Sequence, residues 1–113
     1  MKSKIIALSK NEEFKYLLKQ KKISNKYVTF FYGRIKNKYN DKLNISFVTK
    51  KKIGNAIKRN KIKRRLKNIT NEAIKKIPIK YNYSYLVIAK PTMLNNDYKI
   101  IKETLFKDLE RIE

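Results

Sequence analysis

The 113-residue sequence contains no cysteine, no histidine and no tryptophan, and it has only two glycines and two prolines. Without cysteine, the chain can form no disulfide framework, thiolate nucleophile or zinc knuckle. Without histidine, it lacks the side chain that most often serves as a general base near neutral pH. The nine carboxylates are scattered rather than paired, so metal-assisted hydrolysis by the protein alone would lack ligands.

Long hydrophobic runs are also missing. The apolar stretch Ile5–Leu8 is too short for the core of a signal peptide, and no small-residue cleavage site follows it. No other run approaches the length that a membrane span needs. We therefore expect a cytoplasmic protein with no membrane partner. Its length supports one hydrophobic core and not two, which predicts a single domain over residues 1–113.

Positive charge is abundant. Lys and Arg number 30 against nine Asp and Glu, which gives a formal net charge of +21, while 42% of the residues are hydrophobic and can form a core. Such a charge repels itself in a compact fold, so it indicates a function beyond solubility. A nucleic acid is the partner that this balance favours, with acidic membranes and acidic proteins as the alternatives.

The N-terminal part of the chain predicts a helix followed by two strands. Ser9 and Glu12 have the spacing of a capping box, which predicts a helix over about residues 9–21. Residues 27–32 are aromatic and β-branched, and apolar residues alternate over 43–47, so both segments are predicted strands. Because the polar residues 37–41 indicate a turn, we expect these strands to pair as an antiparallel hairpin.

A long basic helix is predicted after Gly54 and Asn55, and Pro78 should end it. Its apolar stripe is formed by Ile62, Leu66, Ile69, Ala73 and Ile77. The roughly opposite face carries Asn60, Arg64, Lys67, Asn71 and Lys75, with Arg59 and Lys63 beside them.

A third, more buried strand is predicted over 83–89. A last helix is capped by Asn95 or Asn96 and has an apolar stripe of Tyr98, Ile101, Leu105, Leu109 and Ile112. The predicted fold class is thus α+β, an α-β-β-α-β-α sandwich with a small sheet.

Two features of this arrangement suit an RNA partner. Cations crowd the start of the basic helix, where the macrodipole disfavours them, so a merely solvated basic face explains the segment less well. On the first predicted strand, Phe30 and Phe31 point to opposite faces, and an aromatic on an open face can stack on an unpaired base. The alternative is that either ring is simply part of the core.

The segment Lys51–Ile57 (KKIGNAI), followed by Arg59–Leu66 (RNKIKRRL), resembles the signature of the bacterial ribonuclease P protein subunit. That family carries a KKxGNAV-like turn and an Arg-Asn-Arg helix at this place. Asn11–Phe14 (NEEF) is similar to the start of the family's first helix. Tyr85–Lys90 (YLVIAK) is similar to its last strand, which usually ends Ile-Ala-Arg. Length, element order and charge agree as well.

The resemblance implies a left-handed crossover between the second and third strands, against the general preference for right-handed ones. It also implies that the protein functions in a ribonucleoprotein. The catalytic RNA of this complex binds magnesium ions and uses them to remove the 5′ leader of precursor tRNA. The protein would contact this leader and the catalytic RNA, and it would contribute no catalytic residues of its own. Its implied partners are these two RNAs, with no obligate protein partner and no metal bound tightly by the protein alone.

Site residues follow from the resemblance position by position. The RNA-binding helix and the turn before it would use Lys51, Lys52, Asn55, Arg59, Asn60, Lys61, Lys63, Arg64 and Lys67. The cleft for the leader would use Phe14, Leu18, Val28, Phe30 and Lys90. Three positions depart from the family pattern. Lys61 and Lys90 replace arginines, which costs the bidentate fork, and Leu18 replaces an aromatic.

Three other classes of protein are alternatives to a ribonuclease P protein subunit. A small ribosomal protein shares the size, charge and α+β build, and would co-sediment with ribosomal subunits. A nuclease that acts without RNA is disfavoured by the scattered carboxylates. A basic membrane-surface peptide is disfavoured by the core pattern of a globule.

Overall fold

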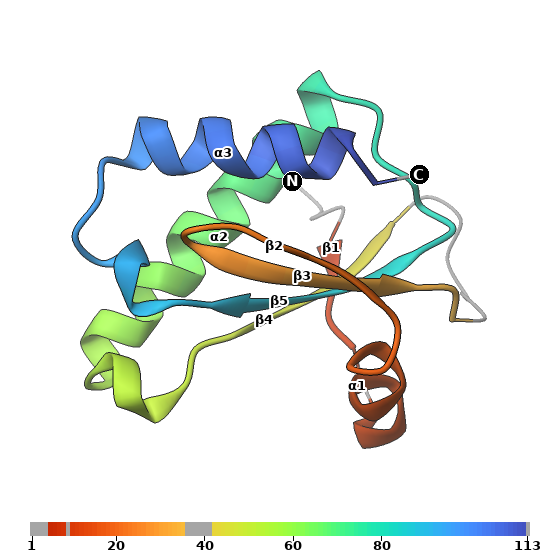
Figure 1. Cartoon of the computed structure of the whole chain (residues 1–113), viewed down its shortest axis with the longest axis horizontal. Helices are drawn as coiled ribbons and strands as arrows, with labels where there is room; N and C mark the ends of the chain where they lie inside the picture. Colours follow the sequence, from red (N-terminus) through yellow and green to blue (C-terminus); the bar gives the residue numbers. More distant parts are fainter. Residues whose placement is uncertain (1–4, 9, 36–41, 113) are drawn as a thin grey trace.

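The computed structural model describes residues 5–8, 10–35 and 42–112. In this part of the chain, three α-helices, two short 3-10 helices and five strands follow one another (Figure 1). Their order is β1 (Ile5–Ile6), α1 (Asn11–Leu17), β2 (Lys21–Ser24), β3 (Val28–Gly33), β4 (Leu43–Val48), η1 (Lys51–Ile53), α2 (Ala56–Lys76), β5 (Ser84–Ala89), η2 (Pro91–Met93) and α3 (Tyr98–Glu110). The predicted α+β class is confirmed.

The strands form one mixed sheet in the order β1-β4-β5-β3-β2. Strand β5 runs antiparallel to β3 and parallel to β4, while β1 is parallel to β4 and β2 is antiparallel to β3. The predicted hairpin of β3 and β4 is therefore wrong, because β5 lies between them. Five of the six residues of β5 are buried, and the centre of the sheet removes the most apolar surface from water.

Two short strands were not predicted. Strand β1 has only two residues, too few to show a periodic pattern. Strand β2 reads Lys21-Lys22-Ile23-Ser24 and is mostly exposed at the edge of the sheet. Lysines are common on edge strands because they discourage pairing with other chains.

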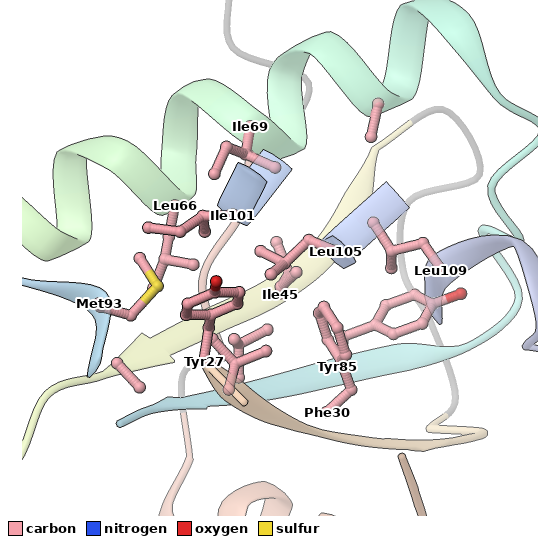
Figure 2. Close-up of a cluster of buried hydrophobic side chains, with 14 of the residues drawn as sticks. Tyr27, Phe30, Ile45, Leu66, Ile69, Tyr85, Met93, Ile101, Leu105 and Leu109 are labelled. Atoms are coloured by element: carbon pink, nitrogen blue, oxygen red, sulfur yellow. The ribbon is translucent and has the colours of Figure 1, made fainter. Parts of the chain in front are cut away.

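The two faces of the sheet are covered differently. Helices α2 and α3 lie over one face, and the short α1 lies against the other (Figure 1). The main core between the sheet, α2 and α3 contains Tyr27, Phe30, Ile45, Leu66, Ile69, Tyr85, Met93, Ile101, Leu105 and Leu109 (Figure 2). A smaller cluster under α1, here named the α1-side cluster, comprises Leu8, Leu17 and Leu86 with the partly buried Phe14, Phe31, Ile35, Val48 and Ile88.

Helix α1 is shorter than predicted at both ends. It begins after Lys10, whose backbone N–H donates to the Glu13 carboxylate at 3.2 Å. The capping pair is therefore shifted from the predicted Ser9 and Glu12, and Ser9 itself lies outside the described residues. The helix ends at Leu17 rather than near residue 21, because the chain already enters β2 there.

Helix α3 begins one or two residues later than predicted. Its cap is Asp97, which accepts the Lys99 N–H at 3.1 Å, rather than Asn95 or Asn96. The Asp97 carboxylate thus satisfies one of the free N–H groups at the start of the helix.

Candidate nucleic-acid interface

Helix α2 separates its apolar and cationic residues onto different faces. Ile62, Leu66 and Ile69 are fully or almost fully buried against the sheet and α3. The predicted RNA-binding residues that are exposed are Lys51, Lys52, Asn55, Asn60, Lys61, Lys63, Arg64 and Lys67. Arg59 is half-buried, and its Nε is buried without a hydrogen-bond partner among the described residues. The amphipathic pattern thus leaves most of the predicted cations available to a polyanion.

A rigid corner sets the direction in which α2 starts. Ile53 at the end of η1 is buried in the main core. Gly54 has φ 155°, a conformation that favours glycine, and a Cβ there would lie 2.8 Å from the Cδ of Lys58. The Asn55 side chain accepts the Lys58 N–H at 3.0 Å and caps the helix. The predicted binding residue Asn55 therefore has a structural role as well.

One arginine of α2 has a different role from its neighbours. Nη1 of Arg65 donates to the backbone carbonyls of Met93 at 3.2 Å and Asn96 at 3.3 Å. These bonds tie α2 to the end of η2 and to the segment that leads into α3. Arg65 thus stabilises the fold.

Two concave surfaces lie along the cationic face. One is a hollow of about 350 Å³ on α2, lined by Asn60, Lys63, Arg64 and Lys67. The other is a groove of about 630 Å³, lined by Lys63, Lys67 and Asn71 of α2 and by apolar residues that include Phe14, Phe47 and Val48. Because Lys63 and Lys67 line both, the cations of α2 adjoin an apolar groove that reaches α1.

Two residues predicted for the leader cleft are core residues. Val28 is 0% exposed and Phe30 is 2% exposed, and both belong to the main core. In this structure their side chains therefore offer almost no surface to a ligand. The alternation on β3 correctly predicts that Phe30 and Phe31 lie on opposite faces of the sheet. It does not indicate which face α2 and α3 cover.

The other face of β3 carries a residue that the sequence analysis did not assign to the site. Phe31 is half-buried in the α1-side cluster, together with the predicted cleft residue Phe14. Both rings thus lie on the face of the sheet that the seven-residue α1 covers. The sequence feature that pointed to Phe31 was the alternation on this strand, which puts one aromatic ring on each face of the sheet.

The remaining predicted cleft residues, Leu18 and Lys90, are not part of the α1-side cluster. Leu18 is 49% exposed at the end of α1. The ammonium of Lys90 donates to Ser24 Oγ at 2.9 Å and to the carbonyl of Asn25, so it braces the turn between β2 and β3. Asn25 in turn donates to the buried Asp108 carboxylate at 2.7 Å.

Neither a metal cluster nor a membrane span is found in the part of the chain that the structure describes. Over residues 5–8, 10–35 and 42–112, no three carboxylates lie together in a way that could hold a metal ion. Within the same residues, no helix is both long enough and apolar enough to cross a bilayer.

Comparison with known proteins gives one consistent family. The family profile described as Ribonuclease P matches residues 3–113. The ribonuclease P protein component of a Nitratiruptor species is 35% identical over 107 residues, which cover 94% of this chain and 91% of that protein. The protein of the same name from Carboxydothermus hydrogenoformans is 33% identical over 102 residues, which cover 87% and 83%.

Solved structures agree with this result. The RNase P protein of Thermotoga maritima superposes with a TM-score of 0.79 at 25% identity, covering 96% of this chain and 98% of that one. The Staphylococcus aureus RNase P protein has a TM-score of 0.73 at 24% identity, with 93% and 92% covered, and supports the fold alone.

Proposed function

The chain belongs to the ribonuclease P protein family, and from this premise we propose which of its surfaces meet the RNAs of the enzyme. As the protein component of this endoribonuclease, it assists the 5′ processing of precursor tRNA and has the ribonuclease P RNA as its partner. We assign the exposed cationic face of α2 to that RNA. The α1 side of the sheet is assigned to the 5′ leader.

The separation of faces on α2 carries the first assignment. A helix that is anchored by a buried stripe can present arginine forks and lysine ammonium groups at fixed positions along an RNA backbone. The residues assigned to this contact are Lys51, Lys52, Asn60, Lys61, Lys63, Arg64 and Lys67, with Arg59 at the margin and Asn55 as the cap. Since each phosphate contact releases counterions, binding should weaken steeply as salt rises.

The second assignment replaces the two core residues of the predicted cleft. Phe14 and Phe31 lie together on the α1 side of the sheet, where rings can stack on bases of a single strand. The groove from Phe14 to Lys63 and Lys67 adds cations for the phosphates. We therefore propose that the leader crosses this groove, with bases toward the aromatic side chains and backbone toward α2.

Lys90 and Leu18 are assigned supporting roles. An ammonium group has three N–H donors, and Lys90 uses two of them to brace the turn between β2 and β3. It can donate the third to a leader phosphate. The exposed Leu18 extends apolar surface at the end of α1 but offers no ring for stacking.

The remaining proposals follow the family. We propose that magnesium is held mainly by the RNA and supplies the activated water for hydrolysis, while this chain positions the leader and neutralises phosphates. We further propose a single domain over 1–113, a cytoplasmic location, no obligate protein partner and a left-handed β4-α2-β5 crossover. An experimentally determined structure with both RNAs would test the crossover and the contacts together.

Reconstitution tests the function itself. Added to a matching catalytic RNA at low magnesium, the full chain should permit accurate cleavage of precursor tRNA, because it neutralises charge that magnesium otherwise screens. The product with its 5′ leader removed is measured on a denaturing gel. A folded protein that gives no increase in cleavage over the RNA alone would refute the proposal.

A further inference from the structure

Ile57 is 77% exposed, more than any other large hydrophobic side chain in the described part of the molecule. It lies in the first turn of α2 and ends the motif Lys51–Ile57, yet the function described above gives it no role. A single exposed hydrophobic residue is common on protein surfaces and needs no explanation by itself. The residues that share its face of the helix, however, indicate a role for Ile57.

Helical spacing places Ile57 on the face assigned to the catalytic RNA. Asn60, Lys61 and Arg64 follow it at i+3, i+4 and i+7, the positions that share one side of an α-helix. All three are exposed. The buried Ile62 is five residues away, which is a rotation of about 140° around the helix axis. Ile57 is therefore the apolar end of a polar and cationic face, outside the stripe that packs on the sheet.

The corner before α2 anchors the helical turn that carries Ile57. Ile53 is buried, Gly54 has its restricted conformation, and Asn55 caps the first turn. The side chain of Lys58 passes close to Gly54 and occupies the space where a Cβ would lie. Ile57 is thus carried by a capped and anchored turn, which lets it hold a defined position against a partner.

We propose that Ile57 packs against the face of an unpaired nucleobase of the catalytic RNA. This inference rests on the proposed function of α2. Lys51, Lys52, Lys58 and Lys61, all within six residues of Ile57 in the sequence, are exposed. Two copies of the chain would bring these like charges together here, whereas a polyanion is complementary. In RNA, the apolar surface that remains within reach of such cations is the face of an unstacked base. Phosphate contacts fix the register of a protein on a nucleic acid, and this contact adds a requirement for an unstacked base at one position.

The test compares two serine variants of the full chain in binding to the matching catalytic RNA. Ile57→Ser should raise the Kd about threefold to tenfold through loss of the base contact. The slope of log K against log salt should not change, because no charge is removed. Ile100→Ser is the matched control, since Ile100 is 52% exposed on α3 and should leave Kd and slope unchanged. Both variants should melt like the wild-type protein.

Tryptophan supplies an independent readout, since the chain has none. The fluorescence of Ile57→Trp should be quenched when one equivalent of the catalytic RNA is added, and that of Ile100→Trp should not. An unchanged Kd for Ile57→Ser, or equal quenching at both positions, overturns the inference. A shift only in the oligomeric state of the free Ile57→Ser protein would instead identify a second copy as the occupant. Failure of the wild-type protein to bind the RNA would refute the proposed function, a separate result.

Discussion

The guanidinium of Arg64 lies in an exposed hollow, whereas that of its neighbour Arg65 donates to two backbone carbonyls. One step of about 100° around α2 therefore separates an exposed arginine from one that is used for packing. The two arginines form a natural pair for testing which cations of this helix contact phosphate.

Arg64→Ala should weaken binding to the catalytic RNA and reduce the slope of log K against log salt by about one. Arg65→Ala should keep that slope but lower the free energy of unfolding by about 1–3 kcal/mol, because the carbonyls of Met93 and Asn96 lose their donor. Salt-dependent binding and urea unfolding measure the two effects. An equal loss of slope in both variants would show that Arg65 also contacts phosphate.

Phe30 and Phe31 form a second pair of neighbours with opposite environments. Phe31→Leu keeps apolar volume but removes the ring, so it should weaken binding of precursor tRNA to the reconstituted enzyme more than binding of mature tRNA, which has no leader. Phe30→Ala removes a core ring and should lower the free energy of unfolding by about 3–5 kcal/mol, with no preference between the two tRNAs. Equilibrium binding of both tRNAs gives the comparison. Equal weakening by Phe31→Leu would remove Phe31 from the leader contact.

At the scale of elements, the sequence predicts those with a strong periodic pattern. The stripe of Ile62, Leu66, Ile69 and Ala73 predicted α2 and its buried face, and Pro78 marked the end of the helix within two residues. The neighbours of β3 and β4 were predicted wrongly, since pairing depends on where β5 buries the most surface. Alternation on β3 likewise predicted two faces without identifying the one that α2 and α3 cover, so it could not show that Phe30 is the buried ring and Phe31 the half-buried one.

The corner before α2 joins the main core to the helix that we assign to RNA binding. Gly54→Ala should lower the free energy of unfolding by about 1–3 kcal/mol, since φ 155° is strained for any residue with a Cβ. The affinity for the catalytic RNA should fall as well, because the start of α2, with Ile57 and Lys61, shifts. Urea unfolding and RNA binding are measured on the same preparation.

A double variant separates the two causes of strain at this corner. Lys58→Ala removes the side chain that a Cβ at position 54 would approach to 2.8 Å. If the backbone conformation is what requires glycine, Gly54→Ala with Lys58→Ala stays as destabilised as Gly54→Ala alone. Full recovery of stability in the double variant would assign the requirement to the Lys58 side chain instead.

For the whole molecule, the nine acidic residues can neutralise at most nine of the 30 cations, which leaves the net charge of +21. Repulsion among like charges destabilises a compact state, and the cost is largest at low ionic strength. We therefore expect the charge on α2 to lower stability in the free protein and, if the proposed RNA contact is right, to contribute affinity in the complex. The same lysines should then affect the free and the bound protein in opposite directions.

This opposition can be measured with Lys63→Gln and Lys67→Gln combined, since both residues are exposed and line both hollows of the interface. At low salt the double variant should melt at a higher temperature than the wild-type protein, because two repelling charges are gone. A single-stranded RNA at 100 times its Kd for the wild-type protein should stabilise that protein by about 2.7 kcal/mol. The same concentration should stabilise the double variant less. The double variant could instead have a lower melting temperature than the wild-type protein at low salt and be stabilised as much by RNA. The charge on α2 would then neither destabilise the free protein nor contribute to its affinity for RNA.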